Sequence, residues 1–198
     1  MGESFMFHLR YLWALLIILF SSQTSAYGVF LKGAIEYGGD TLLESFSTDG
    51  ENEELKAGSL FLLGGGFVLQ PQTEGGYGHS TEIGFFYKFD SIDYRNANFS
   101  FDRYPIELIH YIHTPSFKFG FGATYHLSPK ISADSDFLGE FDFTFDNALG
   151  GILEVGLPLN ANKSAEFIIR ATIIEYKEKA TGITADGSSL GAGFAFYF

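Results

Sequence analysis

Three polar residues in the second half of the chain have types and spacing that suit hydrolysis. His126 and Ser128 are separated by one residue in YHLSP, and Glu140 follows in GEF. Alternate residues of a strand project to the same side, so His126 could act as the base that activates Ser128, with Glu140 orienting the imidazole. The same geometry also suits a structural histidine that bonds to a glutamate or a tyrosine. We favour the structural role and predict no catalytic residue.

Charged residues also recur at intervals within segments that are otherwise apolar. Four of them are cations and four are carboxylates, and each falls on the less apolar face of its segment if that segment is a strand. Buried ions are costly unless they are paired, so the equal numbers favour a network of ion pairs inside a protein. With the histidine, the predicted network comprises Lys32, Glu36, Glu82, Lys88, Glu107, Lys118, His126, Glu154 and Arg170.

Other polar clusters have weaker spacing. The acidic runs TDGENEE (48–54) and SADSD (132–136) offer carboxylates for Ca²⁺ or for the divalent ions of lipopolysaccharide, but the spacing fits no EF-hand. Solvated loops are the favoured interpretation. His110 and His113 are three residues apart and therefore lie on opposite faces of a strand. LGGGF (63–67) lacks the Gly-Lys-Ser/Thr of a phosphate loop, so its glycines are expected to bend a strand. We predict no metal and no cofactor.

The elements that carry these residues alternate between apolar and polar positions with a period of two. Each segment is about as long as a tilted strand that crosses a membrane. The alternating segments predict eight strands, at 29–37, 58–70, 81–89, 104–112, 117–127, 148–157, 165–176 and 188–198. Segment 58–70 is apolar on both faces, so its register stays open.

The connections alternate in length, which indicates how the strands are arranged. Short turns follow the second, fourth and sixth strands, whereas longer acidic loops follow the odd ones. This pattern is typical of an outer-membrane barrel with periplasmic turns, and an even strand count places both termini on the periplasmic side. The predicted fold is all-β, an eight-stranded antiparallel up-and-down transmembrane barrel. A soluble barrel of the lipocalin type, with its ions facing water, is the alternative.

Composition limits the remaining choices. The chain has 198 residues, which suits one domain, and no cysteine, so it forms no disulfide. The net charge of −12 argues against binding nucleic acid. Residues 1–26 have the charged, apolar and small-residue regions of a secretory signal peptide, and the apolar run from Tyr11 to Phe20 is too short to span a bilayer. We therefore expect a signal peptide at 1–26 and a barrel domain at 27–198.

The last strand resembles the signal by which bacterial outer-membrane proteins engage their barrel-assembly machinery. Its alternate residues are apolar and its final residue is aromatic. The residues that carry this resemblance are Leu190, Ala192, Phe194, Phe196 and Phe198. The resemblance implies that the barrel-assembly machinery is a partner.

The stretch RYPIELIHYIHTPSFKFGFGATYHLSP (103–129) resembles the central hairpin of small outer-membrane barrels of the OmpW kind. The Pro105 start, the turn at Thr114-Pro115 and the glycine-rich FGFGATYH carry the similarity. The whole chain is similar to uncharacterised outer-membrane β-barrel proteins of Gram-negative bacteria. This resemblance implies a location in the cell outer membrane, contact with its lipid and lipopolysaccharide, and passage or binding of small apolar molecules.

Three functions follow as hypotheses. The first is a narrow conduit or binding barrel for small apolar solutes. The second is a structural or surface-interaction barrel with acidic extracellular loops. The third is a lipid A-modifying hydrolase, because the His126–Ser128 pair resembles that of outer-membrane lipid A deacylases, although Pro129 follows the serine where those enzymes carry Asn.

Overall fold

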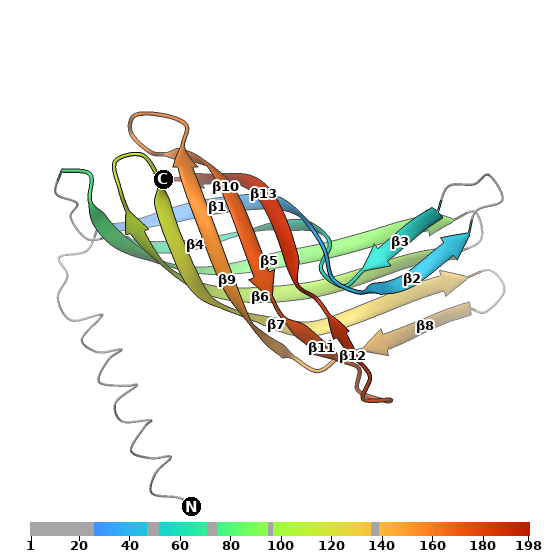
Figure 1. The fold of residues 1–198 in the computed structure, drawn as a ribbon. Helices are drawn as coiled ribbons and strands as arrows, with labels where there is room; N and C mark the ends of the chain where they lie inside the picture. Colours follow the sequence, from blue (N-terminus) through green and yellow to red (C-terminus); the bar gives the residue numbers. More distant parts are fainter. Residues whose placement is uncertain (1–25, 47–51, 71–74, 95–96, 136–138) are drawn as a thin grey trace, which may run out of the picture.

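The computed structural model describes residues 26–46, 52–70, 75–94, 97–135 and 139–198, and these residues are almost entirely β-structure (Figure 1). Eight long strands form the body of the molecule. They are β1 (Ala26–Tyr37), β4 (Leu60–Gln70), β5 (Gly78–Tyr94), β6 (Ala97–His113), β7 (Lys118–Ser135), β9 (Ala148–Pro158), β10 (Ala165–Ile173) and β13 (Ser189–Tyr197). No helix among the described residues has the length and hydropathy needed to span a membrane.

The eight strands close into an antiparallel barrel, which confirms the predicted fold. Each strand pairs with its sequence neighbours among the eight, and β1 pairs with β13 to seal the ring. The C-terminus lies at the same end as the three short turns that follow β4, β6 and β9 (Figure 1). Closure leaves no free edge in the barrel wall, so every wall strand has a partner on both sides.

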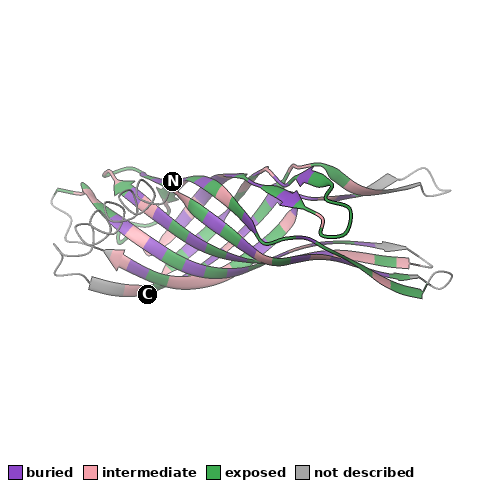
Figure 2. Cartoon of the chain, turned by 90° about the horizontal axis from the view of Figure 1, so that it is seen from below, coloured by how far each residue is buried: buried purple, intermediate pink, exposed green. Residues whose placement is uncertain are grey.

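The two faces of the wall alternate as the period-two pattern predicts. Apolar residues face outward: Leu31 is 54% exposed, Ile35 56% and Leu153 48%, while the intervening polar residues are buried. The alternating buried and exposed stripes are visible along each strand in Figure 2. The barrel is therefore apolar outside and charged inside, the reverse of a soluble barrel, and the lipocalin-type alternative is wrong.

The structure also fixes the register of β4. Leu62 and Val68 face the interior, whereas Phe61, Leu63 and Phe67 face outward. Glycine is required between them, because a Cβ atom at Gly66 would lie 2.0 Å from the carbonyl oxygen of Ile83. The glycines of LGGGF therefore let neighbouring strands approach closely, whereas the expected bend of the strand stays a prediction.

The sequence suggested loops after the first, third, fifth and seventh wall strands, which are β1, β5, β7 and β10. The structure has β-hairpins there instead. Strands β5, β6 and β7 continue beyond the barrel, and β8 (Gly139–Thr144) pairs with the outer part of β7. Two further hairpins stand beside them, β2 (Thr41–Phe46) with β3 (Asn52–Lys56), and β11 (Glu175–Lys177) with β12 (Thr184–Asp186). We call these elements together the extension. In Figure 1 β2, β3 and β8 lie at the end opposite the C-terminus.

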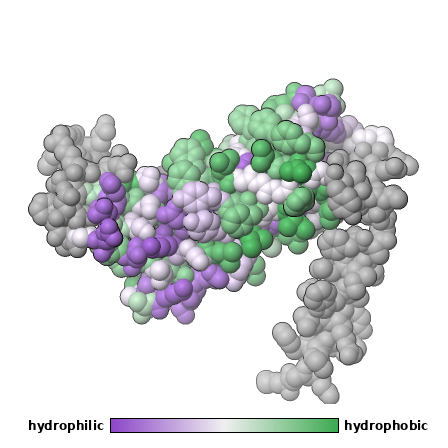
Figure 3. Space-filling model, turned by 180° about the vertical axis from the view of Figure 1, so that it is seen from behind, coloured by the Kyte–Doolittle hydropathy of each residue, from purple (hydrophilic) through white to green (hydrophobic). Residues whose placement is uncertain are grey.

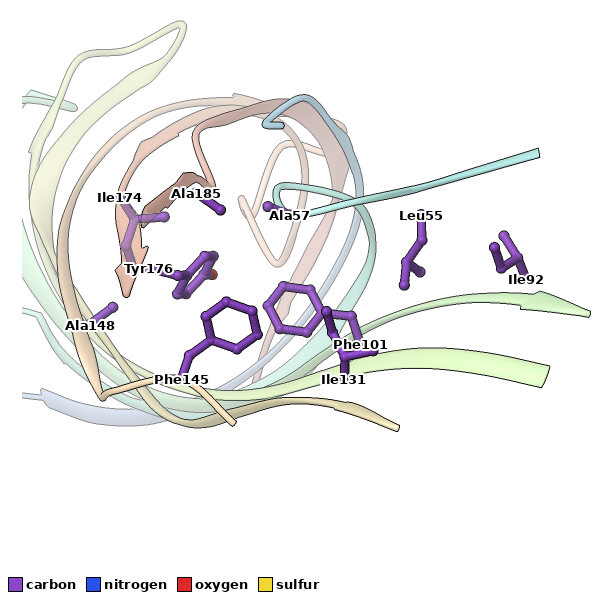
Figure 4. Close-up of a cluster of buried hydrophobic side chains, with 10 residues drawn as sticks. All are labelled: Leu55, Ala57, Ile92, Phe101, Ile131, Phe145, Ala148, Ile174, Tyr176 and Ala185. Carbon is purple, nitrogen blue, oxygen red and sulfur yellow. The ribbon is translucent and has the colours of Figure 1, made fainter. Parts of the chain in front are cut away.

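Polarity reverses between barrel and extension, which is why sequence patterning missed the hairpins. In the extension most apolar residues face inward, and polar residues such as Ser91 and Asn98 face outward. A buried cluster results, from Leu55, Ala57, Ile92, Phe101, Ile131, Phe145, Ala148, Ile174, Tyr176 and Ala185 (Figure 4). Figure 3 shows hydrophobic residues over the barrel wall and hydrophilic residues toward the extension.

A β-bulge in β7 keeps the faces in phase across this boundary. The pairing with β6 shifts between Asp102 and Tyr104, so that Tyr104 faces Leu127 and Asp102 faces Lys130. Ser128 lies in the extra segment with a positive φ of 46°. The extra residue turns Ile131 inward and Lys130 outward, because it changes the alternation by one position.

Residues 1–25 lie outside the described residues, as do residues 48–51 of the acidic run 48–54. The predicted signal peptide at 1–26 and barrel domain at 27–198 therefore stay predictions. Ala26, the last residue of the predicted signal peptide, is the first residue of β1 and pairs with Gln70.

Candidate functional site: the charged lumen and the extension

At the end with the short turns, the Glu82 carboxylate lies in the lumen between one hydroxyl donor, Tyr197, and one ammonium donor, Lys118. Lys118 Nζ lies 3.0 Å from Glu82 Oε1 and 2.9 Å from Glu166 Oε2. The Tyr197 hydroxyl donates to Glu82 Oε1 at 2.8 Å and is itself in contact with Lys118. Strands β5, β7, β10 and β13 supply these four residues, so the group joins strands from both halves of the chain.

Lys32 connects this group to the middle of the lumen. Its Nζ lies 3.1 Å from Glu82 Oε2 and 2.9 Å from Glu154 Oε1. Tyr111 completes the cluster, since Lys32 donates to its hydroxyl at 3.1 Å and that hydroxyl donates to Glu154 at 2.7 Å. One ammonium thereby neutralises two carboxylates that come from two different strands, β5 and β9.

Arg170 carries the network toward the extension. Its Nε lies 2.9 Å from Glu36 Oε1, its Nη2 2.6 Å from Glu107 Oε1, and its Nη1 3.7 Å from Glu154 Oε2. Lys88 Nζ lies 2.6 Å from the other oxygen of Glu36. The planar guanidinium suits three carboxylates better than a lysine would, because its donors point in fixed, separate directions.

The structure thus places eight of the nine sequence-predicted lumen residues in one continuous chain of ion pairs. Each of the eight is at most 3% exposed. Apolar residues fill the cross-section beside them, including Phe30, Phe86, Ile109 and Ile168, each at most 1% exposed. The chemistry of this arrangement is mutual neutralisation at low dielectric, which favours a filled lumen over a site that exchanges ligands.

His126 is the exception among the nine. It is buried, but its Nδ1 shares a 2.7 Å hydrogen bond with the hydroxyl of Tyr176 rather than with an ion. Ser128 is exposed and its N–H donates to Asn147, while Glu140 is exposed on β8. The inference that His126 and Ser128 share a face is wrong, because the bulge at Ser128 interrupts the alternation. The structure does not bring the three residues of the hydrolase hypothesis together.

Arg103 joins β6 to the connection between β3 and β4, and it was missed from the sequence. It is fully buried, donates to the carbonyl oxygens of Ala57 and Ser59, and lies 4.1 Å above the centre of the Phe101 ring. These contacts hold the β3–β4 connection against β6. Parity could have identified Arg103, because it lies an even number of residues before the inward-facing Glu107.

Glu166, Tyr111 and Tyr197 were also missed as lumen partners. Glu166 has the parity of Arg170, and Tyr111 that of Glu107. Tyr197 lies between the outward-facing Phe196 and Phe198. The parity rule given for Arg103 would have identified all three. They were missed because the prediction counted only charged residues on clearly amphipathic segments.

The C-terminal strand faces as expected. All five residues of the proposed assembly signal, Leu190, Ala192, Phe194, Phe196 and Phe198, are exposed on the outer wall. Phe198 is 77% exposed, and its backbone exchanges hydrogen bonds of 2.9 and 3.2 Å with Val29. The chain terminus is therefore fixed to the first strand while its side chain points away from the protein.

The extension holds an apolar pocket of about 270 Å³ between its hairpins. Phe143 at its rim is 45% exposed and Ile183 is 67% exposed. The pocket is lined by Leu42, Leu43, Ile131, Phe143, Phe145, Glu178, Thr181, Ile183 and Ala185. The pocket is an open apolar recess.

Carboxylates surround the extension and are stabilised in their charged form. Hydrogen bonds from the Thr181 hydroxyl and from the N–H groups of Ala180 and Thr181 lower the pKa of Glu178. A hydrogen bond with Lys130 lowers the pKa of Asp142. Among the described residues, no group of three His, Asp or Glu side chains is placed to hold a metal ion.

Comparisons with known proteins found similarity only among solved structures. No protein-family model matches the chain, and no characterised protein matches it in sequence. Ail, the attachment invasion locus protein of Yersinia pestis, is 11% identical over 86% of this chain and 97% of that chain, with a TM-score of 0.43. Neisserial surface protein A is 12% identical over 89% and 100%, with a TM-score of 0.46.

OmpT, an outer membrane protein of Vibrio cholerae, is 13% identical over 88% of this chain and 55% of that chain, with a TM-score of 0.27. These similarities are too weak to transfer a function. The strand pairings themselves define the class of this protein, a closed eight-stranded antiparallel barrel with an apolar exterior and an ion-paired lumen.

Proposed function

We propose that the chain is an integral outer-membrane protein whose lumen is closed and whose working part is the extension, a surface for interactions outside the cell. The reversal of polarity along β5, β6 and β7 carries this proposal. On the barrel side of Phe89 the outward residues are apolar and suit lipid. On the extension side of Phe89 the outward residues Ser91, Asn98 and Ser132 suit water. Outer-membrane phospholipid and lipopolysaccharide would surround the wall.

The accessibility of an inserted epitope to antibody would show which end of the barrel faces the outside of the cell. An epitope tag inserted between Ser135 and Gly139 should bind antibody on intact cells. The matched tag between Thr114 and Phe117, in a short turn, should bind only after the outer membrane is permeabilised. The reverse result, or recovery of the chain from periplasmic extract without detergent, would overturn the proposed topology.

The closed lumen makes a separate forecast. Passage of an apolar solute would require displacing Lys32, Glu154 and Arg170 from their partners, and leaving buried charges unpaired is costly. Purified protein in a planar bilayer should therefore show no unit conductance steps. Regular steps from a folded sample would support the conduit hypothesis instead.

Binding of small apolar molecules is a second candidate, and the apolar pocket of the extension favours it. Its volume of about 270 Å³ exceeds the roughly 150 Å³ of a cavity that holds benzene. Ligand-induced stabilisation measured with aromatic hydrocarbons, and its loss in Phe143→Ser, would test this candidate. In either case we propose a binding role rather than catalysis, because His126 is committed to Tyr176.

Assembly would depend on the last strand. We propose that the barrel-assembly machinery recognises the outward row that ends in Phe198, since that row is presented on the surface and the backbone behind it is paired.

A further inference from the structure

We propose that the free edge of β8 binds an extended peptide in which apolar and basic residues alternate. In the described part of the chain β8 pairs as a strand only with β7 and ends the order of the main sheet, although the carbonyl oxygen of its last residue, Thr144, accepts a hydrogen bond from the Lys179 N–H at 3.0 Å. Its far side from Gly139 to Phe143 has no strand beside it among the described residues. Such an edge presents unpaired N–H and C=O groups, which is the surface used when a peptide adds a strand to a sheet.

Edge strands are usually protected against this kind of pairing, and β8 lacks the usual protection. Its sequence, GEFDFT, contains no lysine, arginine or proline, and its pairing with β7 runs without a bulge. The residues that could discourage pairing are Glu140 and Asp142, which are acidic. They would repel a second copy of β8 and attract a basic strand, so the edge selects by charge.

The inner face of the same edge selects for apolar side chains. Phe141 and Phe143 alternate with the acids and lie on the same face as their buried partners on β7, Ala133 and Ile131, although Phe143 itself is 45% exposed. Phe143 also lines the apolar pocket, so an inward side chain on an added strand would lie over an existing recess of about 270 Å³. That recess accommodates one aromatic or branched side chain, given that about 150 Å³ holds a benzene ring.

The outer face of β8 determines which residues of the bound peptide should alternate with its apolar residues. Glu140 and Asp142 face outward, and Asp134 lies directly opposite Glu140 on β7. Lys130 pairs with Asp142 at 2.9 Å, but both side chains are substantially exposed, so this bridge neutralises the face only in part. Lysine or arginine at alternate positions of the added strand would lie beside these acids, and opposite charges on neighbouring strands attract.

This inference deepens the proposed surface role and rests on it, because the peptide must come from outside the cell. The binding chemistry can nevertheless be measured on purified protein, where the orientation of the barrel in a membrane does not matter. Failure of the peptide to bind would therefore leave the proposed topology untouched, and a failed epitope experiment would leave the edge untouched.

The probe is a fluorescent octapeptide of alternating lysine and valine, titrated by anisotropy into the full chain folded in detergent. Two matched peptides serve as controls: one with the same residues in two blocks, and one N-methylated at alternate residues to remove the N–H donors. We expect binding of the alternating peptide, and at least tenfold weaker binding of both controls. Equal binding of the N-methylated or the block peptide would overturn the proposal.

Two charge reversals locate the site on the protein. Glu140→Lys on β8 should weaken binding about threefold to tenfold, because attraction beside the edge becomes repulsion of similar size. Glu175→Lys on β11 makes the same change in net charge away from the edge and should leave affinity unchanged. Equal weakening by both variants, or none by Glu140→Lys, would contradict an edge site. The heat-dependent gel shift of each variant checks that the barrel is folded.

Discussion

Removal of the Lys32 ammonium should destabilise the barrel more than any change to the outer wall. Lys32→Met keeps the length of the side chain but removes the charge that neutralises Glu82 and Glu154. Glu82 retains Lys118 at 3.0 Å, whereas Glu154 keeps only Tyr111 and a 3.7 Å contact with Arg170. The main cost is therefore a poorly compensated carboxylate at Glu154.

Breaking a buried ion pair by removing one partner typically costs about 3–5 kcal/mol. We expect a loss of that order in the free energy of unfolding, measured by urea titration in lipid vesicles with circular dichroism. The double variant Lys32→Met/Glu154→Gln removes both charges and should recover most of the loss. Leu31→Met, on the outward face of the same strand, should change stability by less than about 0.5 kcal/mol.

A Lys32→Met protein as stable as the wild type would refute the reasoning, because it would mean that water, not Lys32, solvates Glu154. A double variant no more stable than the single one would also contradict it, since the penalty would then come from lost packing and not from an uncompensated charge.

Three further outcomes follow from other parts of the molecule. Gly66→Val should prevent folding into a heat-modifiable barrel, because its Cβ would lie 2.0 Å from the Ile83 carbonyl oxygen; a normal gel shift would contradict the close strand approach. Removing Phe198 should lower the amount of assembled barrel in the outer membrane while leaving refolding in detergent intact, and an unchanged level would count against the assembly signal. The folded-state pKa of Glu178 is lowered by its hydrogen bonds, so its contribution to the β11–β12 hairpin is full at neutral pH and is lost as the pH falls below the ordinary carboxylate range of about 4. Hydrogen exchange at Thr181 should accelerate there in the wild type but vary little with pH in Glu178→Gln, apart from the intrinsic exchange rate.

The barrel itself was predictable because one physical rule governs every wall strand. Leu31 outside and Lys32 inside alternate for the same reason as Phe119 and Lys118, and an even number of such strands lets the first and last pair antiparallel. The extension escaped prediction because its apolar residues face inward. Ile131 and Ala133 alternate with polar residues just as wall residues do, but in a segment rich in Ser and Asp that resembles a loop.

The candidate site was predictable in part. The ions of the lumen could be found from parity alone, but the partners of each could not, because pairing depends on how the sheet curls. Arg170 meets Glu36 and Glu107, which are far from it in sequence and lie on different strands. The bulge at Ser128 had no recognisable signal, and it separated two residues that a regular strand would have kept on one face.

The network of ion pairs also bears on how a misassembled chain would fare. Its members come from β1, β5, β6, β7, β9 and β10, so a sheet that stops short of closing leaves some of these charges without counterions. Inserting unpaired charges into the hydrocarbon of the bilayer is costly, so such an intermediate would stay in the aqueous compartment, where proteases can cleave it. The buried salt bridges would then act as quality control, admitting to the bilayer only polypeptides whose first and last strands have already met.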